Sequence, residues 1–426
     1  MKLFCVRWNE ADRRKKILAF FIGTIFLTLL ARILWQHFHG VSFGWIEHDD
    51  WMDFFNVNYW SQKGFNPYTS EFRSSYPPLI LFFAKLVSYL ADYSRDTFIV
   101  AKTFWGIVSY HLVFLGFSAL TVLAFVRMMK DRGCSVGQRI GVSVALMLTV
   151  PYLYAYERGN YIFLVVTCIA WFFAWFQSEK RWQRETALVL LAVAAGIKLY
   201  PAFLAAILLR DRRFKDFFKT CLYTVAAFFL PFLAFSGGFS NVGAFIENLT
   251  SFQALNPASA LNYSMPTFLF YFSQLGNGLV LSEAPNWVFS VGGVLASALL
   301  VLGLLLSLFA DRAWKSFALI SVALIVYPAP SFLYSASLLL PVVVLFLTEE
   351  NPRRIHWVYT SLFLLILAPI SLGYLVSPYI FPGGLLRDNL MQQSAMLCLF
   401  LLLSVESIAN LWRTLRRGRK SFSENS

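Results

Sequence analysis

Long apolar runs separated by short basic clusters dominate the pattern along the chain. A membrane-spanning helix needs about 20 mainly apolar residues, because a helix rises about 1.5 Å per residue and the hydrocarbon core is about 30 Å thick. The pattern therefore predicts an all-α, polytopic transmembrane helical bundle with roughly 10–13 membrane helices, counting short or re-entrant ones. The runs expected to form membrane helices are 17–35, 98–126, 140–155, 161–177, 220–236, 287–310, 316–328, 331–348, 356–377 and 394–412.

Two further runs do not fit a straight span. Residues 78–91 begin at Pro77-Pro78 and are short for a crossing, so we expect a re-entrant or interfacial helix. Residues 186–209 have basic clusters at both ends and Lys198 to Pro201 in the middle. A straight span would leave one basic cluster on the outer face. We therefore expect two half-helices that break at Lys198–Pro201 and return to the side from which they came.

Loop charge sets the expected orientation. Lys and Arg gather in short clusters between the apolar runs, which is typical of cytoplasmic loops. These clusters are Arg13 to Lys16, Lys180-Arg181, Arg210 to Lys219, Arg353-Arg354 and Arg413 to Lys420. The expected organisation is a cytoplasmic N-terminus at 1–16, one transmembrane domain at 17–412 with long outer loops at 36–75 and 237–286, and a cytoplasmic basic tail at 413–426.

Composition supports this class. The chain is 58% hydrophobic and 14% charged, whereas soluble domains are nearer a quarter charged. The net charge of +13 lies in the loop clusters, so it indicates membrane orientation and we expect no nucleic-acid partner. The five cysteines and five histidines show no metal-ligand spacing. We expect no metal and no cofactor.

An acidic cluster follows the first apolar run and includes Asp49, Asp50 and Asp53. A carboxylate at the membrane interface can accept the proton of an attacking hydroxyl. One such base suffices for glycosyl transfer when the leaving group is already a phosphate. Asp50 and Asp53 are three residues apart, so a helical turn would place both on one face. The alternative is that the three acids solvate a loop or cap a short helix.

The residues after this cluster form an ordered series of short motifs. They are Asp53-Phe54-Phe55, Gly64, Asn66-Pro67-Tyr68, Tyr76-Pro77-Pro78-Leu79, Trp105, Arg158-Gly159-Asn160, Gly196 to Pro201 and Asn262-Tyr263-Ser264. Their order resembles glycosyltransferase family 87, which belongs to the GT-C superfamily of membrane transferases that use polyprenyl-phosphate sugars. The resemblance implies an aspartate base in the first outer loop. Asp53 fits it best by its spacing to Gly64 and Asn66, and Asp50 is the next candidate.

Two positions depart from the pattern of the family. Glu157 to Asn160 stand where many members have Gly-Gln-x-Asn, and the histidine that several members carry near Tyr334 is missing. These departures leave the sugar and the acceptor open. The resemblance implies that Tyr76, Asn160 and Tyr334 bind substrate.

Three more residues are candidates for substrate binding. Lys198 is an ionisable residue in an apolar run, so it either binds a lipid phosphate at the helix break or snorkels to the interface. Arg158 either binds phosphate through two parallel hydrogen bonds or pairs with Glu157. Asn262 either binds sugar hydroxyls or forms a turn.

The resulting expectation is a multi-pass enzyme of a bacterial inner membrane with its active site on the outer face. It would transfer a hexosyl group, with mannose expected, from a polyprenyl-phosphate sugar to a glycan or glycolipid acceptor with inversion. One alternative is a transporter or flippase for lipid-linked saccharides, although the chain shows no repeated halves. Another is a polysaccharide polymerase or ligase, although the expected outer loop 237–286 contains no Arg or His.

Overall fold

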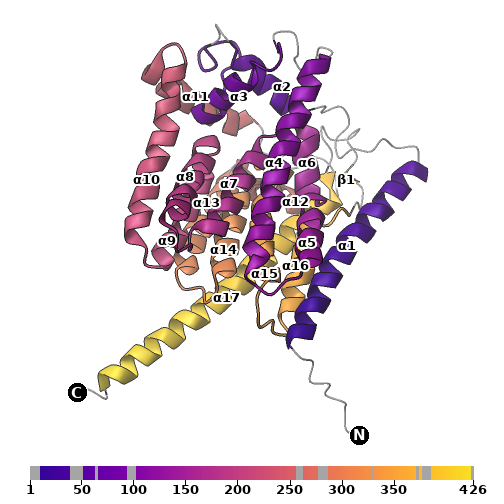
Figure 1. Ribbon diagram of the computed structural model, residues 1–426, viewed down its shortest axis with the longest axis vertical. Coiled ribbons are helices and arrows are strands. Elements are labelled where there is room, and N and C mark those ends of the chain that lie inside the picture. Colours follow the sequence, from indigo (N-terminus) through magenta and orange to yellow (C-terminus); the bar gives the residue numbers. More distant parts are fainter. Residues whose placement is uncertain are drawn as a thin grey trace.

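The protein is an all-α bundle in a computed structural model (Figure 1). The structure describes residues 10–38, 51–62, 66–93, 102–255, 262–276, 286–327, 330–370, 374–376 and 385–423. Five helices in this part are long and apolar enough to cross a membrane. They are α1 (Glu10–Phe38), α4 (Phe104–Lys130), α10 (Phe214–Phe229) continued by η2 (Leu230–Ala234), α13 (Asn286–Ser307) and α17 (Arg387–Ser423).

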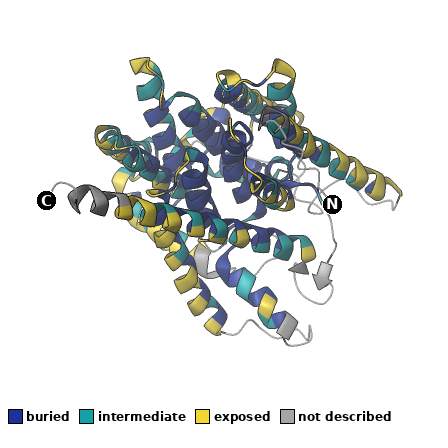
Figure 2. Cartoon of the chain, turned by 90° about the horizontal axis from the view of Figure 1, so that it is seen from below, coloured by how far each residue is buried: buried dark blue, intermediate teal, exposed yellow. Residues whose placement is uncertain are grey.

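These long helices expose most of their apolar surface. Only 11% of the apolar window of α10 and 22% of that of α1 is buried inside the protein. In Figure 2 their outer faces are yellow, while the centre of the bundle is dark blue. Exposed apolar side chains on helices of this length are stable against lipid and not against water. The chain is therefore a multi-pass membrane protein.

Shorter apolar helices fill the centre. A sixth crossing is a broken one, formed by α5 (Val136–Met147) and α6 (Val150–Arg158), which meet at 54°. The short helices are α3 (Pro78–Val87), α7 (Ile162–Trp175), α9 (Ala206–Arg210) with η1 (Tyr200–Ala205), α14 (Ala313–Val326), α15 (Leu339–Leu347) with η4 (Leu333–Leu338), and α16 (His356–Leu367). Every residue of α15, and every residue of α14 after Ala313, is buried, so these helices pack on protein on all sides.

The predicted break at Lys198 is confirmed. Helix α8 (Arg181–Ile197) ends there, and Lys198 is extended with φ −138° and ψ 126°. Glu185 near the start of α8 pairs with Lys219 near the start of α10. Gln177 Nε2 also donates to Asp211 Oδ2 at 3.3 Å, just after α9 ends. The segment α8–η1–α9 therefore starts and finishes on the same side as a re-entrant hairpin.

Both segments expected to be outer loops contain helices in the part that the structure describes. The first contains α2 (Met52–Trp60), and the second contains η3 (Gly238–Ser240), α11 (Asn241–Leu255) and α12 (Met265–Gly276). A short antiparallel pair, β1 (Tyr374–Val376) and β2 (Leu385–Leu386), precedes α17.

The hairpin predicts which surface residues share a side of the membrane. Single cysteines replacing Glu179, before α8, and Lys215, in the first turn of α10, should react with an impermeant maleimide from the same face. Both positions are exposed. The background would have its five native cysteines replaced by serine. Thr69→Cys, near α2 at the other end of the bundle, is the control and should react from the opposite face. Reaction of Glu179→Cys and Lys215→Cys from opposite faces would show that α8–α9 crosses the membrane.

Candidate active site

A cavity of about 560 Å³ lies at the end of the bundle that carries α2, α3 and α11 (Figure 1). Its walls come from α2 and the loop after it, the end of α6, the tip of the α8–η1 hairpin, α11 and the segment 330–335. Its charged lining residues are Asp53, Arg73, Arg158 and Lys198. The cavity therefore holds one acidic and three basic side chains, together with aromatic, aliphatic and neutral polar ones.

Asp53 lies in the first turn of α2 and faces this cavity. The opposite face of α2 is anchored by Phe54, whose ring stacks on Tyr161 at 5.5 Å, and by Asn58, whose amide donates to the Tyr161 hydroxyl at 2.7 Å. Only 8% of Asp53 is exposed. The rigid packing of α2 fixes the position of this carboxylate.

The carboxylate of Asp53 has two partners from one short segment. Asn160 Nδ2 donates to Oδ2 at 2.5 Å, and Arg158 Nε lies 3.3 Å from Oδ1. The Asn160 side chain is oriented because its Oδ1 accepts the N–H of Ile162 at 3.0 Å, which leaves its amide to point at Asp53. A carboxylate has about four lone-pair positions, so Asp53 can still accept a further proton donor.

Gly159 lies where the main chain after α6 contacts the main chain before α2. Its φ is +67°, where a side chain is strained, and a Cβ there would lie 2.7 Å from the Trp51 carbonyl oxygen. The Trp51 N–H in turn donates to the Glu157 carbonyl at 2.9 Å. The main chains before α2 and after α6 are therefore in direct contact. This contact sets the distance between Asp53 and Arg158.

Aromatic rings support the cations of the site. The Arg158 guanidinium lies 5.3 Å from the Phe332 ring centre. The Lys198 ammonium lies 5.0 Å from the Tyr334 ring centre and 5.9 Å from that of Tyr76. Within the described part of the chain, no carboxylate lies within ion-pair distance of Lys198. Its charge is therefore available to an anion in the cavity.

The structure brings together six of the eight residues predicted for the site. Asp53, Arg158, Lys198, Tyr76 and Tyr334 line the cavity, and Asn160 holds Asp53 from behind. Asn262 is not among the lining residues. Its Oδ1 accepts the N–H groups of Ser331 and Ser264, at 2.8 and 2.9 Å, and so fixes the chain next to Phe332. Asp50, like Asp49 and Gly64, lies outside the described residues.

Sequence reasoning missed many of the lining residues, among them Asn56, Trp60 and Arg73. Asn56 and Trp60 stand three and seven residues after Asp53, which is the spacing of one helix face, so a helix predicted at 52–60 would have found them. Arg73 lies in an irregular loop and has no such signal.

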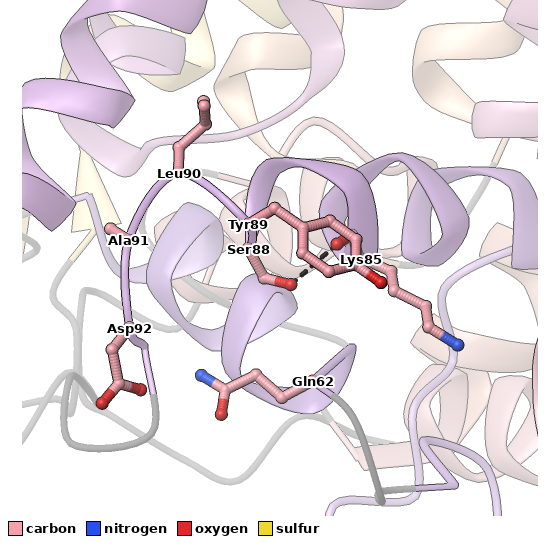
Figure 3. A pocket seen from close by; sticks show the side chains of 7 residues that line it. All are labelled: Gln62, Lys85, Ser88, Tyr89, Leu90, Ala91 and Asp92. Carbon is pink, nitrogen blue, oxygen red and sulfur yellow. Dashed lines mark hydrogen bonds between the residues drawn. The ribbon is translucent and has the colours of Figure 1, made fainter.

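A second hollow of about 440 Å³ lies at the end of α3 (Figure 3). Its polar groups include Gln62 and Asp92. The Lys85 ammonium at its edge donates to the Ala234 carbonyl at 2.8 Å, and the Ser88 hydroxyl donates to the Lys85 carbonyl at 2.7 Å (Figure 3). This hollow shares no lining residue with the first cavity and contains none of the predicted site residues.

The fold and the cavity together define a class: a multi-pass membrane protein with a paired, nearly buried acid beside an accessible cation. Such a grouping is typical of an enzyme active site. In the part of the chain that the structure describes, no three His, Cys, Asp or Glu side chains gather closely enough to hold a metal ion.

The sequence profile of glycosyltransferase family 87 matches residues 75–336, more than half of the chain. The chain belongs to this family and is a membrane glycosyltransferase. The match contains Tyr76, Arg158, Lys198 and Tyr334, whereas Asp53 lies before it. A comparison with curated proteins finds no match. Membership in the family gives no support to the transporter alternative.

The contact at Gly159 predicts the effect of a single added methyl group. Gly159→Ala should force the main chain at Trp51 away and shift Asp53 relative to Arg158. Because a misplacement of about 1 Å can lower a rate about 100-fold, we expect a loss of about 10- to 100-fold in the turnover of sugar transfer. Gly116→Ala is the matched control, since a Cβ there meets nothing within 4 Å. Unchanged turnover in Gly159→Ala would contradict this coupling.

Proposed function

We propose that the protein transfers a hexosyl group, with mannose expected, from a polyprenyl-phosphate sugar to a hydroxyl of a glycan or glycolipid, with inversion. The observation that carries this proposal is the placement of Asp53, held by Asn160 and Arg158, in one cavity with the ammonium of Lys198, which has no ion-pair partner among the described residues. This arrangement provides a base for the acceptor and a cation for the leaving phosphate.

The proposed reaction is a single displacement at the anomeric carbon. Asp53 accepts the proton of the acceptor hydroxyl as its oxygen bonds to the anomeric carbon. The bond from that carbon to the phosphate oxygen breaks, and the phosphate leaves with the electron pair. Lys198 and Arg158 stabilise the added negative charge on the phosphate. Attack from the face opposite the leaving group inverts the configuration.

The apolar lining supports a lipid-borne donor. Phe203 on η1 and Phe252 on α11 line the cavity and are 41% and 42% exposed. Leu199 at the hairpin tip, which is 39% exposed, adds to the same apolar wall. An isoprenoid chain could rest on this wall while its phosphate reaches Lys198.

The position of the cavity supports an outer-face reaction. The cavity lies near α2 and α11, whereas the basic clusters around Lys180 and Arg213 lie at the other end of the bundle (Figure 1). Basic clusters mark the cytoplasmic side of a membrane protein. We therefore place the acceptor on the outer face of a bacterial inner membrane.

The assignment of the base predicts a large loss in Asp53→Asn. General-base catalysis contributes about 10²–10⁴-fold, so transfer from a polyprenyl-phosphate mannose by the purified enzyme in nanodiscs should fall by that factor. The Asn oxygen can still accept from one of the two donors, but its NH2 group then faces the other donor and Arg158 loses its partner charge, so the thermal unfolding midpoint should fall. Activity is therefore compared at a temperature at which both proteins are folded. Asp131→Asn, an exposed acid after α4, is the control. Full activity in Asp53→Asn would remove Asp53 as the base.

The assignment of the phosphate site predicts weaker donor binding in Lys198→Met. The side-chain length is kept and the charge is removed. A hydrogen bond to a charged group contributes about 1.5–3 kcal/mol, so the apparent KM for the donor should rise about 10- to 100-fold. Lys85→Met, at the second hollow, is the matched control. An unchanged KM for the donor in Lys198→Met would show that the phosphate binds elsewhere.

A further inference from the structure

One face of α2 points into the cavity along the whole helix. Asp53, Asn56 and Trp60 are separated by three and four residues, so they lie on one face, and all three line the cavity. The opposite face packs into the aromatic core through Phe54 and Phe55. The helix therefore presents, in order, the proposed base, an amide and a large aromatic ring.

The ring of Trp60 belongs to an aromatic platform. It stacks on Phe72 at 5.8 Å with an angle of 28° between the rings, and Tyr76 lies 6.2 Å away at 51°. Trp60 and Phe72 are only partly buried, and both line the cavity. An aromatic ring next to hydrogen-bonding groups suits a ligand that has one apolar face and several hydroxyl groups. A pyranose ring has this character.

Polar groups surround the platform. Arg73, Ser74 and Ser75 line the cavity beside Phe72. Arg73 has a φ of +41°, a conformation that residues other than glycine rarely adopt. Such strain often marks a functional position when the surrounding structure holds it in place.

The loop that carries Arg73 is held firmly. The Ser74 N–H donates to the Pro67 carbonyl at 2.8 Å, and the Asn248 amide on α11 donates to the carbonyls of Tyr68 and Ser74 at 3.0 and 3.2 Å. Asn66 donates to Asn241 Oδ1 at 2.9 Å. The Asn66-Pro67-Tyr68 motif therefore fixes the loop Phe72–Ser75, which forms the cavity wall next to Trp60.

The spacing along α2 sets the size of the ligand. Seven residues separate Asp53 from Trp60, which is a rise of about 10 Å along the helix. A single pyranose ring is too short to reach both. The apolar wall of Phe203 and Phe252 belongs to other elements, η1 and α11, so the two walls differ in chemistry.

We propose that α2 and the loop Phe72–Ser75 form the acceptor subsite and that the acceptor is a saccharide of at least two sugar residues. The attacking hydroxyl lies at Asp53, the Asn56 amide binds a neighbouring hydroxyl, and the next ring stacks on Trp60 and Phe72. The Arg73 guanidinium donates hydrogen bonds to that second sugar. This inference rests on the proposed function and adds the size and the binding mode of the acceptor.

The first test separates acceptor binding from donor binding. Purified enzyme in nanodiscs would be given a radiolabelled polyprenyl-phosphate mannose and a glycan extract from cells in which the gene is deleted. Trp60→Ala should lower kcat/KM for the extract at least tenfold and leave the KM for the donor within twofold. Trp60→Phe should recover most of the loss because it keeps a ring. Trp105→Ala, an exposed aromatic residue on α4 away from the cavity, is the matched control.

Three outcomes are informative in different ways. If the wild-type enzyme transfers no sugar, the proposed function fails before the acceptor subsite is tested. If Trp60→Ala raises the KM for donor and acceptor together, or changes neither, the acceptor subsite is wrong. Phe72→Ala repeats the measurement in case Trp60→Ala does not fold.

The second test measures the length of the acceptor. A panel of octyl hexosides with one, two and three sugars, including several linkages, would be used as competitors against the glycan extract. The best two-sugar compound should inhibit at least tenfold more strongly than the best one-sugar compound. This difference should disappear in Trp60→Ala. Equal inhibition by one- and two-sugar compounds in the wild-type enzyme would overturn the proposed length.

Discussion

The arrangement of the active site depends on a nearly buried carboxylate that has to be paired. Asp53 is nearly buried, and an isolated charge in such a position would be strongly destabilising. Arg158 and Asn160 satisfy it, and both come from the end of α6 and the turn after it. Only a glycine at 159 allows the main chain of Trp51 to come close enough. This contact, together with the packing of Phe54 and Asn58 on Tyr161, sets the position of α2 and of the groups on its cavity face.

Much of the membrane architecture could be predicted from the sequence because charge is placed asymmetrically along it. The break at Lys198 was predicted since a straight span would have put a basic cluster on the wrong side, and ion pairs such as Glu185–Lys219 now show the return. The helices α11 and α12 were missed. Their apolar faces are interrupted by polar residues, so neither the length nor the hydropathy of a span indicated them.

The sequence predicted those site residues whose side chains carry charge. It predicted less well the residues whose side chains hold the backbone in place. Lys198 and Arg158 were found from their charge, and the resemblance to the family singled out Asp53 among three acids. The structure places all three residues in one cavity. Asn262 was expected near the sugar, yet its side chain holds the backbone of Ser331 and Ser264. A short polar motif can thus contain the same residue types whether it binds a ligand or holds the cavity wall in place. Only contacts between segments distant in the sequence distinguish these two roles.

The re-entrant hairpin has a consequence for how this architecture can change. Because α8 and α9 begin and end on the same side, they add no crossing to the chain, and their removal or extension leaves the orientation of every later helix the same. The tip at Lys198 is nevertheless held tightly, since a Cβ on the neighbouring Gly196 would lie 2.7 Å from Leu79 and 3.0 Å from the Ala227 carbonyl. The two arms of the hairpin can thus vary in length while its tip keeps its contacts with α3 and α10. The length of the hairpin can therefore differ between related chains while every later helix keeps its orientation in the membrane.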